Sequence, residues 1–137
     1  MLLLLPLLAA CGSESDDPGQ PPAEADPELV QMLVLTSAGG EVGPQPYLVD
    51  DRDQMQDYVK TFEDRDDVAA AIQQAVKDAE DRPGVLAVAT VAIGCDVPDE
   101  VNFSKSGEVW EVTPGKIPDP LPECFAPTTS IALVELP

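Results

Sequence analysis

The chain has 137 residues and a formal net charge of −19 at pH 7, because seven Lys and Arg residues stand against 26 Asp and Glu residues. Nucleic acids and anionic lipid surfaces bind basic patches, so this charge balance argues against both as partners of the protein surface. The chain also contains no histidine, which excludes Ser-His and Cys-His nucleophile pairs and imidazole metal ligands. We therefore expect neither a metal nor an organic cofactor.

The N-terminus has the features of an export signal. Residues 1–10, MLLLLPLLAA, are apolar but fall short of the about 20 residues that a membrane-spanning helix needs, which is typical of a signal peptide. The residues Leu8, Ala9, Ala10 and Cys11 resemble the lipobox of bacterial lipoproteins. The resemblance implies cleavage before Cys11, acyl chains such as palmitate on Cys11, and a lipid anchor on the outer side of the bacterial cell membrane. The alternative is an apolar N-terminus that reaches a buried cysteine by coincidence.

Residues 11–28 are predicted to be the lipidated cysteine and a tether. The stretch GSESDDPGQPPAEADPE (12–28) contains four prolines, six acidic residues and no basic residue. Such a segment buries too little apolar surface to offset its conformational entropy, and its prolines and like charges keep it extended. The remaining residues, 29–137, are enough for a single domain with one core.

The first half of this domain is predicted to contain one strand and two helices. The run LVQMLVLT (29–36) is dense in long and β-branched apolar residues, which favours a strand. In DDRDQMQDYVKTFED (50–64), Asp50 or Asp51 is a suitable N-cap and Gln54 has capping-box spacing. In RDDVAAAIQQAVKDAEDRPG (65–84), Asp66 or Asp67 is the expected N-cap and Pro83-Gly84 the expected end. The apolar positions with helical spacing are Met55, Tyr58, Val59 and Phe62 in the first helix, and Val68, Ile72, Ala75, Val76 and Ala79 in the second.

The second half is predicted to be strands. Residues 85–94, VLAVATVAIG, are apolar on both faces, as in a central strand. Residues 101–105 and 108–113 flank Ser106-Gly107, a two-residue hairpin signal, and a proline-rich loop (115–127) leads to a last strand within 129–137. The order of elements predicts an α+β fold: a mainly antiparallel sheet with two helices packed on one face.

The cysteine count predicts one disulfide. If the lipid uses Cys11, then Cys95 and Cys124 remain as a pair, and outside the cytoplasm such a pair is expected to be oxidised. A thiol metal site or a redox pair is the alternative, which the absence of a CxxC motif and of histidine disfavours.

The order of elements from 47 to 137 resembles the small domain of bacterial protease-complex stability proteins. The features that carry the resemblance are an N-terminal apolar strand, a helix containing Tyr58 and Phe62, a strongly apolar strand that ends in a turn, a hairpin, and a terminal apolar strand closed by Pro137. That family usually has a Gly-Gly-Tyr turn after the central strand, whereas GCDVP (94–98) stands here. The resemblance implies a non-catalytic lipoprotein that binds a protein partner.

Two other features are candidate sites. The acidic clusters at 50–53 and 63–67 have the residue types of calcium ligands or of paired catalytic carboxylates, but they lack EF-hand spacing and stand where helices begin, which favours helix capping. Trp110 is either a partner contact or a cover for the sheet.

The predicted function is that of a membrane-anchored, extracytoplasmic, non-catalytic accessory module. It would bind an envelope protein or a cell-wall component through the hairpin and the proline-rich loop. The alternative is a carboxylate-dependent hydrolase, which would need a pocket where two carboxylates converge.

Overall fold

A computed structural model describes residues 24–137, so the predicted signal peptide, the predicted lipobox with Cys11 and most of the predicted tether lie outside the described residues. One four-stranded antiparallel sheet has the strand order β1-β6-β3-β2, and β4 and β5 form a separate two-stranded hairpin. The elements in chain order are β1 (Glu28–Thr36), β2 (Tyr47–Leu48), α1 (Arg52–Lys60), α2 (Arg65–Asp78), β3 (Val85–Gly94), β4 (Val101–Ser106), β5 (Val109–Pro114) and β6 (Thr128–Leu136).

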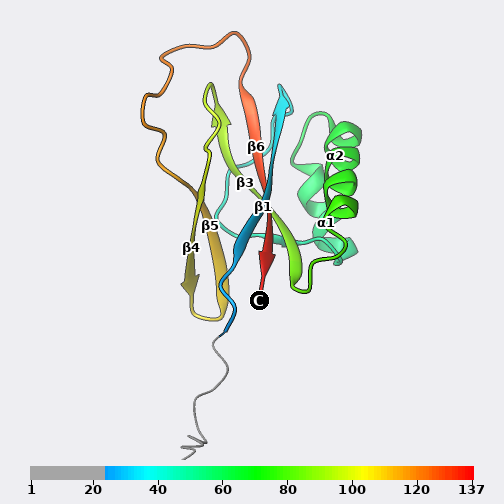
Figure 1. Ribbon diagram of the computed structural model, residues 1–137. Coiled ribbons are helices and arrows are strands. Elements are labelled where there is room, and N and C mark those ends of the chain that lie inside the picture. The colour runs from blue at the N-terminus through cyan, green and yellow to red at the C-terminus, as the bar shows by residue number, and fades with distance from the viewer. Residues whose placement is uncertain (1–23) are drawn as a thin grey trace, which may run out of the picture.

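The fold has three layers, with the sheet in the middle (Figure 1). Helices α1 and α2 cover one face, where Val88, Ile131 and Leu133 are fully buried against them. The β4-β5 hairpin covers the other face, where Ala89 and Val134 are fully buried beneath its apolar side chains. The predicted α+β class, with helices on one face of a mainly antiparallel sheet, is confirmed.

The central positions of β3 and β6 in the sheet explain why both strands carry apolar side chains on both faces. Successive side chains of a strand point to opposite faces, so a strand covered on both sides is expected to be largely apolar on both. The structure places β6 between β1 and β3, with Leu33 opposite Ile131 and Ala89 opposite Ala132. The predicted bounds of the strand at 85–94 are identical to those of β3.

Helix α1 begins as predicted. The Asp51 side chain accepts hydrogen bonds from the backbone N–H groups of Asp53 and Gln54, at 3.1 and 3.0 Å. The Gln54 side chain donates back to Asp51 and accepts from the backbone N–H of Leu48, both at 3.0 Å. Asp51 is therefore the N-cap, and the Gln54 amide links this cap to β2.

The start of helix α2 differs from the prediction. The helix begins at Arg65 after Asp64, whose side chain makes no capping hydrogen bond, while Asp66 and Asp67 lie in the first turn. There their charges still favour the positive end of the helix dipole, so acidic residues near a helix start do not by themselves identify the N-cap. The helix ends at Asp78, before the predicted stop at Pro83.

The hairpin turn also differs, by one residue. Ser106 pairs with Val109, so the two turn residues are Gly107 and Glu108. Gly107 has a φ of +65°, and a two-residue turn with glycine first suits the twist of paired strands. The conformation that only glycine adopts easily therefore places Gly107 at the first turn position.

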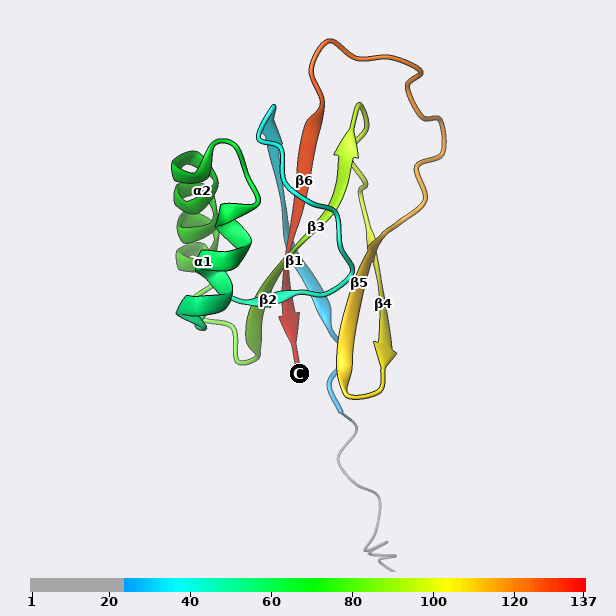
Figure 2. The ribbon, with the colours of Figure 1, turned by 180° about the vertical axis from the view of Figure 1, so that it is seen from behind.

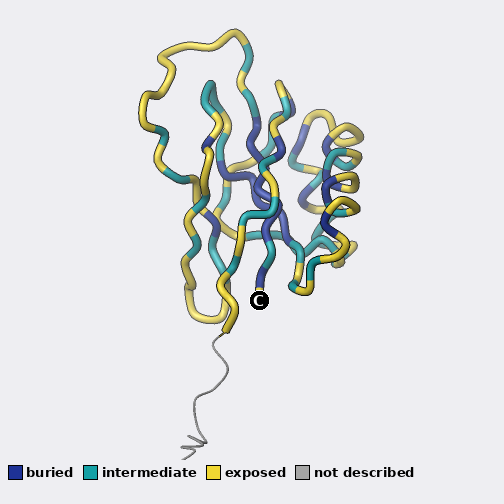
Figure 3. The backbone as a smooth tube through the Cα atoms, in the orientation of Figure 1, coloured by how far each residue is buried: buried dark blue, intermediate teal, exposed yellow. Residues whose placement is uncertain are grey.

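Residues in the middle of the molecule are more buried than residues at its two ends. The middle of β3 and β6 is buried, whereas most of the loop between β5 and β6 is exposed (Figure 3). That loop lies at the end of the sheet where β1 and β3 finish, opposite the end where the chain enters β1 at Glu28 (Figure 1).

Candidate functional site

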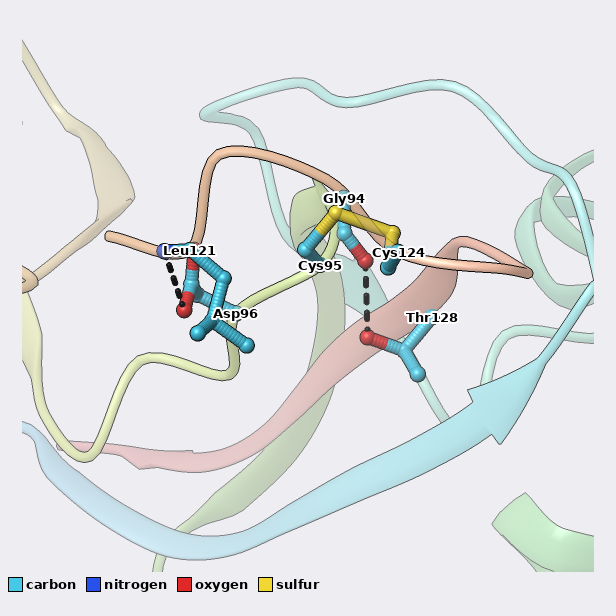
Figure 4. Close-up of a disulfide and its surroundings, with 6 residues drawn as sticks. All are labelled: Gly94, Cys95, Asp96, Leu121, Cys124 and Thr128. Atoms are coloured by element: carbon cyan, nitrogen blue, oxygen red, sulfur yellow. Dashed lines mark hydrogen bonds between the residues drawn. A yellow bond between two sulfur atoms is a disulfide. The ribbon is translucent and has the colours of Figure 1, made fainter.

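The disulfide joins Cys95 and Cys124, as predicted, with 5.2 Å between their Cα atoms. Cys95 follows directly after β3, and the hydroxyl of Thr128, at the start of β6, donates to the Gly94 carbonyl oxygen at 3.0 Å. The Asp96 carboxylate accepts the backbone N–H of Leu121 at 2.9 Å (Figure 4). The covalent bond and these hydrogen bonds hold the loop 115–127, here called the distal loop, to the end of the sheet.

The distal loop exposes large apolar side chains. Phe125 is fully exposed and Leu121 is 59% exposed. Exposed apolar groups that a disulfide holds in place suit a protein contact surface. The role of the proline-rich loop as a contact surface stays a prediction.

Trp110 lies against the sheet. It is half-buried and packs on the apolar cluster that includes Val112, and the ammonium group of Lys105 lies 4.7 Å from the centre of its ring. Packing between hairpin and sheet accounts for the position of Trp110, so its role as a partner contact stays a prediction.

The acidic clusters at 50–53 and 63–67 form no metal site. In residues 24–137 no group of three or more Asp, Glu or Cys side chains is arranged to hold a metal ion. The backbone hydrogen bond from Gln54 lowers the pKa of the Asp51 carboxyl, as expected for a helix cap. Within the same range neither helix has the length and apolar content needed to cross a bilayer.

The structure contains a groove that sequence reasoning missed. The groove, here called the interhelical groove, runs between α1 and α2 and reaches the start of β3, with a volume of about 1020 Å³. Its apolar lining includes Met55, Val59, Ile72, Val76 and Leu86. Of these side chains only Ile72 is buried, so the other four leave apolar surface within reach of a ligand.

The charge of the groove is opposite to that of the chain. Five of the seven Lys and Arg residues line it, namely Arg52, Lys60, Arg65, Lys77 and Arg82. Its acidic lining residues in the described part of the chain are Asp50 and Glu80. The sequence contains a signal for this arrangement, since these five basic residues fall within residues 52–82, but the pattern does not reveal that they share one groove.

One of these basic residues has a structural role. Arg82 donates to Glu135 at 2.9 Å and to Glu28 at 3.1 Å, and Glu135 also accepts the backbone N–H of Gly84 at 2.7 Å. The hydrogen bond from Arg82 lowers the pKa of the Glu135 carboxyl, and the same bond raises the pKa of Arg82. Arg82 therefore joins the start of β3 to β1 and β6.

The other four basic residues are open to a ligand. Lys60 contacts only the exposed Asp57 on its own helix, at 2.8 Å, and such surface pairs are weak. None of the ion pairs within residues 24–137 involves Arg52, Arg65 or Lys77. The groove thus combines a half-buried apolar floor with four cations that make no ion pair to another element of the described chain.

Comparison with known proteins gives no match: no family description, characterised protein or solved structure is significantly similar to the chain. The resemblances to bacterial lipoproteins and to protease-complex stability proteins therefore remain predictions.

Proposed function

We propose that this protein is a lipid-anchored, extracytoplasmic module that binds an envelope partner without catalysis. The lipobox resemblance at Cys11 supports the anchor, and the Cys95–Cys124 disulfide supports export because disulfides persist in oxidising compartments. The tether enters at one end of the sheet and the distal loop lies at the other, which suits a domain that faces away from the membrane.

The observation that carries the binding role is the charge of the interhelical groove. In a chain of net charge −19, five of seven cations line one apolar groove. Helix ends favour Lys60 and Lys77, and two carboxylates hold Arg82. Solubility and helix stability give no reason for Arg52 and Arg65 to lie beside the half-buried apolar lining of the groove. Binding an anionic partner provides one, because complementary potentials attract the partner and suppress wrong ones.

Site-specific photo-cross-linking in intact membranes tests this function. A photo-reactive amino acid replaces Gln73, an exposed residue of the groove lining, and in a matched variant it replaces Glu108 at the hairpin turn. We expect the membrane fraction to yield a discrete adduct from position 73 and none from position 108. Adducts from neither position, or equal adducts from both, would contradict a groove-based binding role.

The same preparation distinguishes the hydrolase alternative. The groove holds two carboxylates, those of Asp50 and Glu80, which a carboxylate-dependent enzyme could use. An Asp50→Asn variant should retain the adduct if the groove binds without catalysis. Loss of a hydrolytic activity in that variant would favour the enzyme instead.

A further inference from the structure

We propose that the occupant of the interhelical groove is an acidic amphipathic helix of a partner protein. This inference rests on the proposed binding function and specifies its ligand. It follows from where the cations lie along the groove, from what they cost the two helices, and from the apolar surface between them.

The cations lie at both ends of the groove. Helices α1 and α2 run side by side in opposite directions and are joined by the short turn 61–64 (Figure 2). Lys60 and Arg65 flank this turn, while Arg52 and Lys77 lie at the other ends of the two helices. With a rise of about 1.5 Å per residue, the eight steps from Arg52 to Lys60 along α1 separate the two pairs of charges by roughly 12 Å.

Helix stability does not explain the two arginines. Lys60 and Lys77 lie in the last turns of their helices, where a positive charge is favourable. Arg52 and Arg65 are the first residues of α1 and α2, where the helix dipole is positive and a cation is unfavourable. Asp53 in α1 and Asp66 and Asp67 in α2 meet the positive ends of the dipoles, but these carboxylates do not line the groove, whereas the two arginines do. The arginines therefore place positive charge on the groove itself, where an anionic ligand would pair with it.

The spacing of the charges selects the class of ligand. A fatty acid or a phospholipid carries its negative charge at one end, so it would engage one pair of cations and leave the other uncompensated. A helix of three to four turns, on the order of 10 to 14 residues, spans the distance between the pairs and carries acidic residues at both ends. Its apolar face, with residues spaced at i, i+3, i+4 and i+7, would pack on Met55, Val59 and Val76.

Fluorescence anisotropy with synthetic peptides tests the inference on the full chain carrying Cys11→Ser, so that no acyl chain of the protein competes. The probe is a labelled amphipathic peptide with leucine on one face and glutamate elsewhere, and its comparator has lysine in place of each glutamate. We expect the glutamate peptide to bind with an affinity that falls as salt rises. Any attraction of the lysine peptide to this chain of net charge −19 should not depend on the arginines of the groove.

The variant Arg52→Glu/Arg65→Glu should weaken binding of the glutamate peptide by about tenfold or more. This variant should fold, because glutamate in the first helical turn is favourable, and circular dichroism checks that it does. The matched control is Lys105→Glu/Lys116→Glu, which changes the net charge equally at the two basic residues outside the groove. The control should bind the peptide like the parent chain.

Three results would overturn the inference: absence of binding by the glutamate peptide, equal weakening in both double variants, or groove-dependent binding of phosphatidylglycerol vesicles or a fatty acid in place of the peptide. These results do not by themselves overturn the proposed binding function, which the cross-linking experiment tests. If adducts at position 73 persist in membranes while the glutamate peptide does not bind, the groove is a binding site for another class of ligand.

Discussion

Removing either hydroxyl of the buried Tyr58–Thr90 pair should destabilise the fold, and removing both should cost less than the sum. The two hydroxyl groups share a hydrogen bond of 2.8 Å, and each residue is 2% exposed. Tyr58→Phe keeps the aromatic ring, which lies 4.9 and 5.1 Å from the rings of Tyr47 and Phe62, so the substitution removes the hydroxyl alone.

Each single substitution leaves one buried hydroxyl without its partner, which costs about 1–3 kcal/mol of the free energy of unfolding. Thr90→Val is nearly isosteric, so Tyr58→Phe/Thr90→Val replaces both partners by apolar groups and should cost clearly less than the two singles together. Urea unfolding of the four proteins measures these free energies. Additive losses, or single losses below about 0.5 kcal/mol, would refute the reasoning that the pair is desolvated and coupled.

The same pair gives the protein an alkaline limit. Burial raises the pKa of Tyr58 far above its ordinary value, which is about 10 in an unfolded chain. The folded state therefore keeps the phenol proton where the unfolded state loses it, so this stability is fully present below about pH 10 and declines above it. The free energy of unfolding of the parent chain should fall more steeply above about pH 10 than that of Tyr58→Phe. Parallel pH dependences would contradict the assignment to Tyr58.

Three further predictions concern the cysteines and the helix cap. Cys95→Ser/Cys124→Ser should lower the free energy of unfolding by about 3 to 4 kcal/mol, because the disulfide closes a loop with a sequence separation of 29. A reductant should destabilise the parent chain similarly and leave the variant unchanged, and the intact mass of the unreduced parent chain should show no alkylation of this pair. Cys11→Ser should leave the detergent phase in which the parent chain partitions, or stay unprocessed, and a variant that partitions and migrates like the parent would contradict lipidation. Asp51→Ala should lower the melting temperature by a few degrees, equally with calcium and with a chelator, because its side chain caps α1; a calcium-dependent rise that Asp51→Ala abolishes would reopen the acidic cluster as a metal site.

Local patterns in the sequence determined the elements of this protein. The strand at 85–94 is recognisable because a strand covered on both faces is apolar at nearly every position, here all but Thr90. Asp51 is recognisable as a cap because a side chain and two nearby N–H groups suffice to form it. The pairing of Cys95 with Cys124 followed from export chemistry and an odd count. Where neighbouring positions can start a helix or form a turn at nearly the same free energy, the predicted position was off by a residue or two. The start of α2 after Asp64 and the turn after Ser106 are the two cases.

Only the tertiary structure decided which distant segments meet. The placement of β6 between β1 and β3, and of the hairpin opposite the helices, depends on pairings between residues far apart in the chain, which no local pattern encodes. The interhelical groove arises in the same way. Arg52 and Lys77 lie 25 positions apart in the sequence and line one groove because two helices pack antiparallel on one face of the sheet. The excess of basic over acidic residues in the groove lining is therefore a property of the folded chain, whereas the composition shows only an acidic protein.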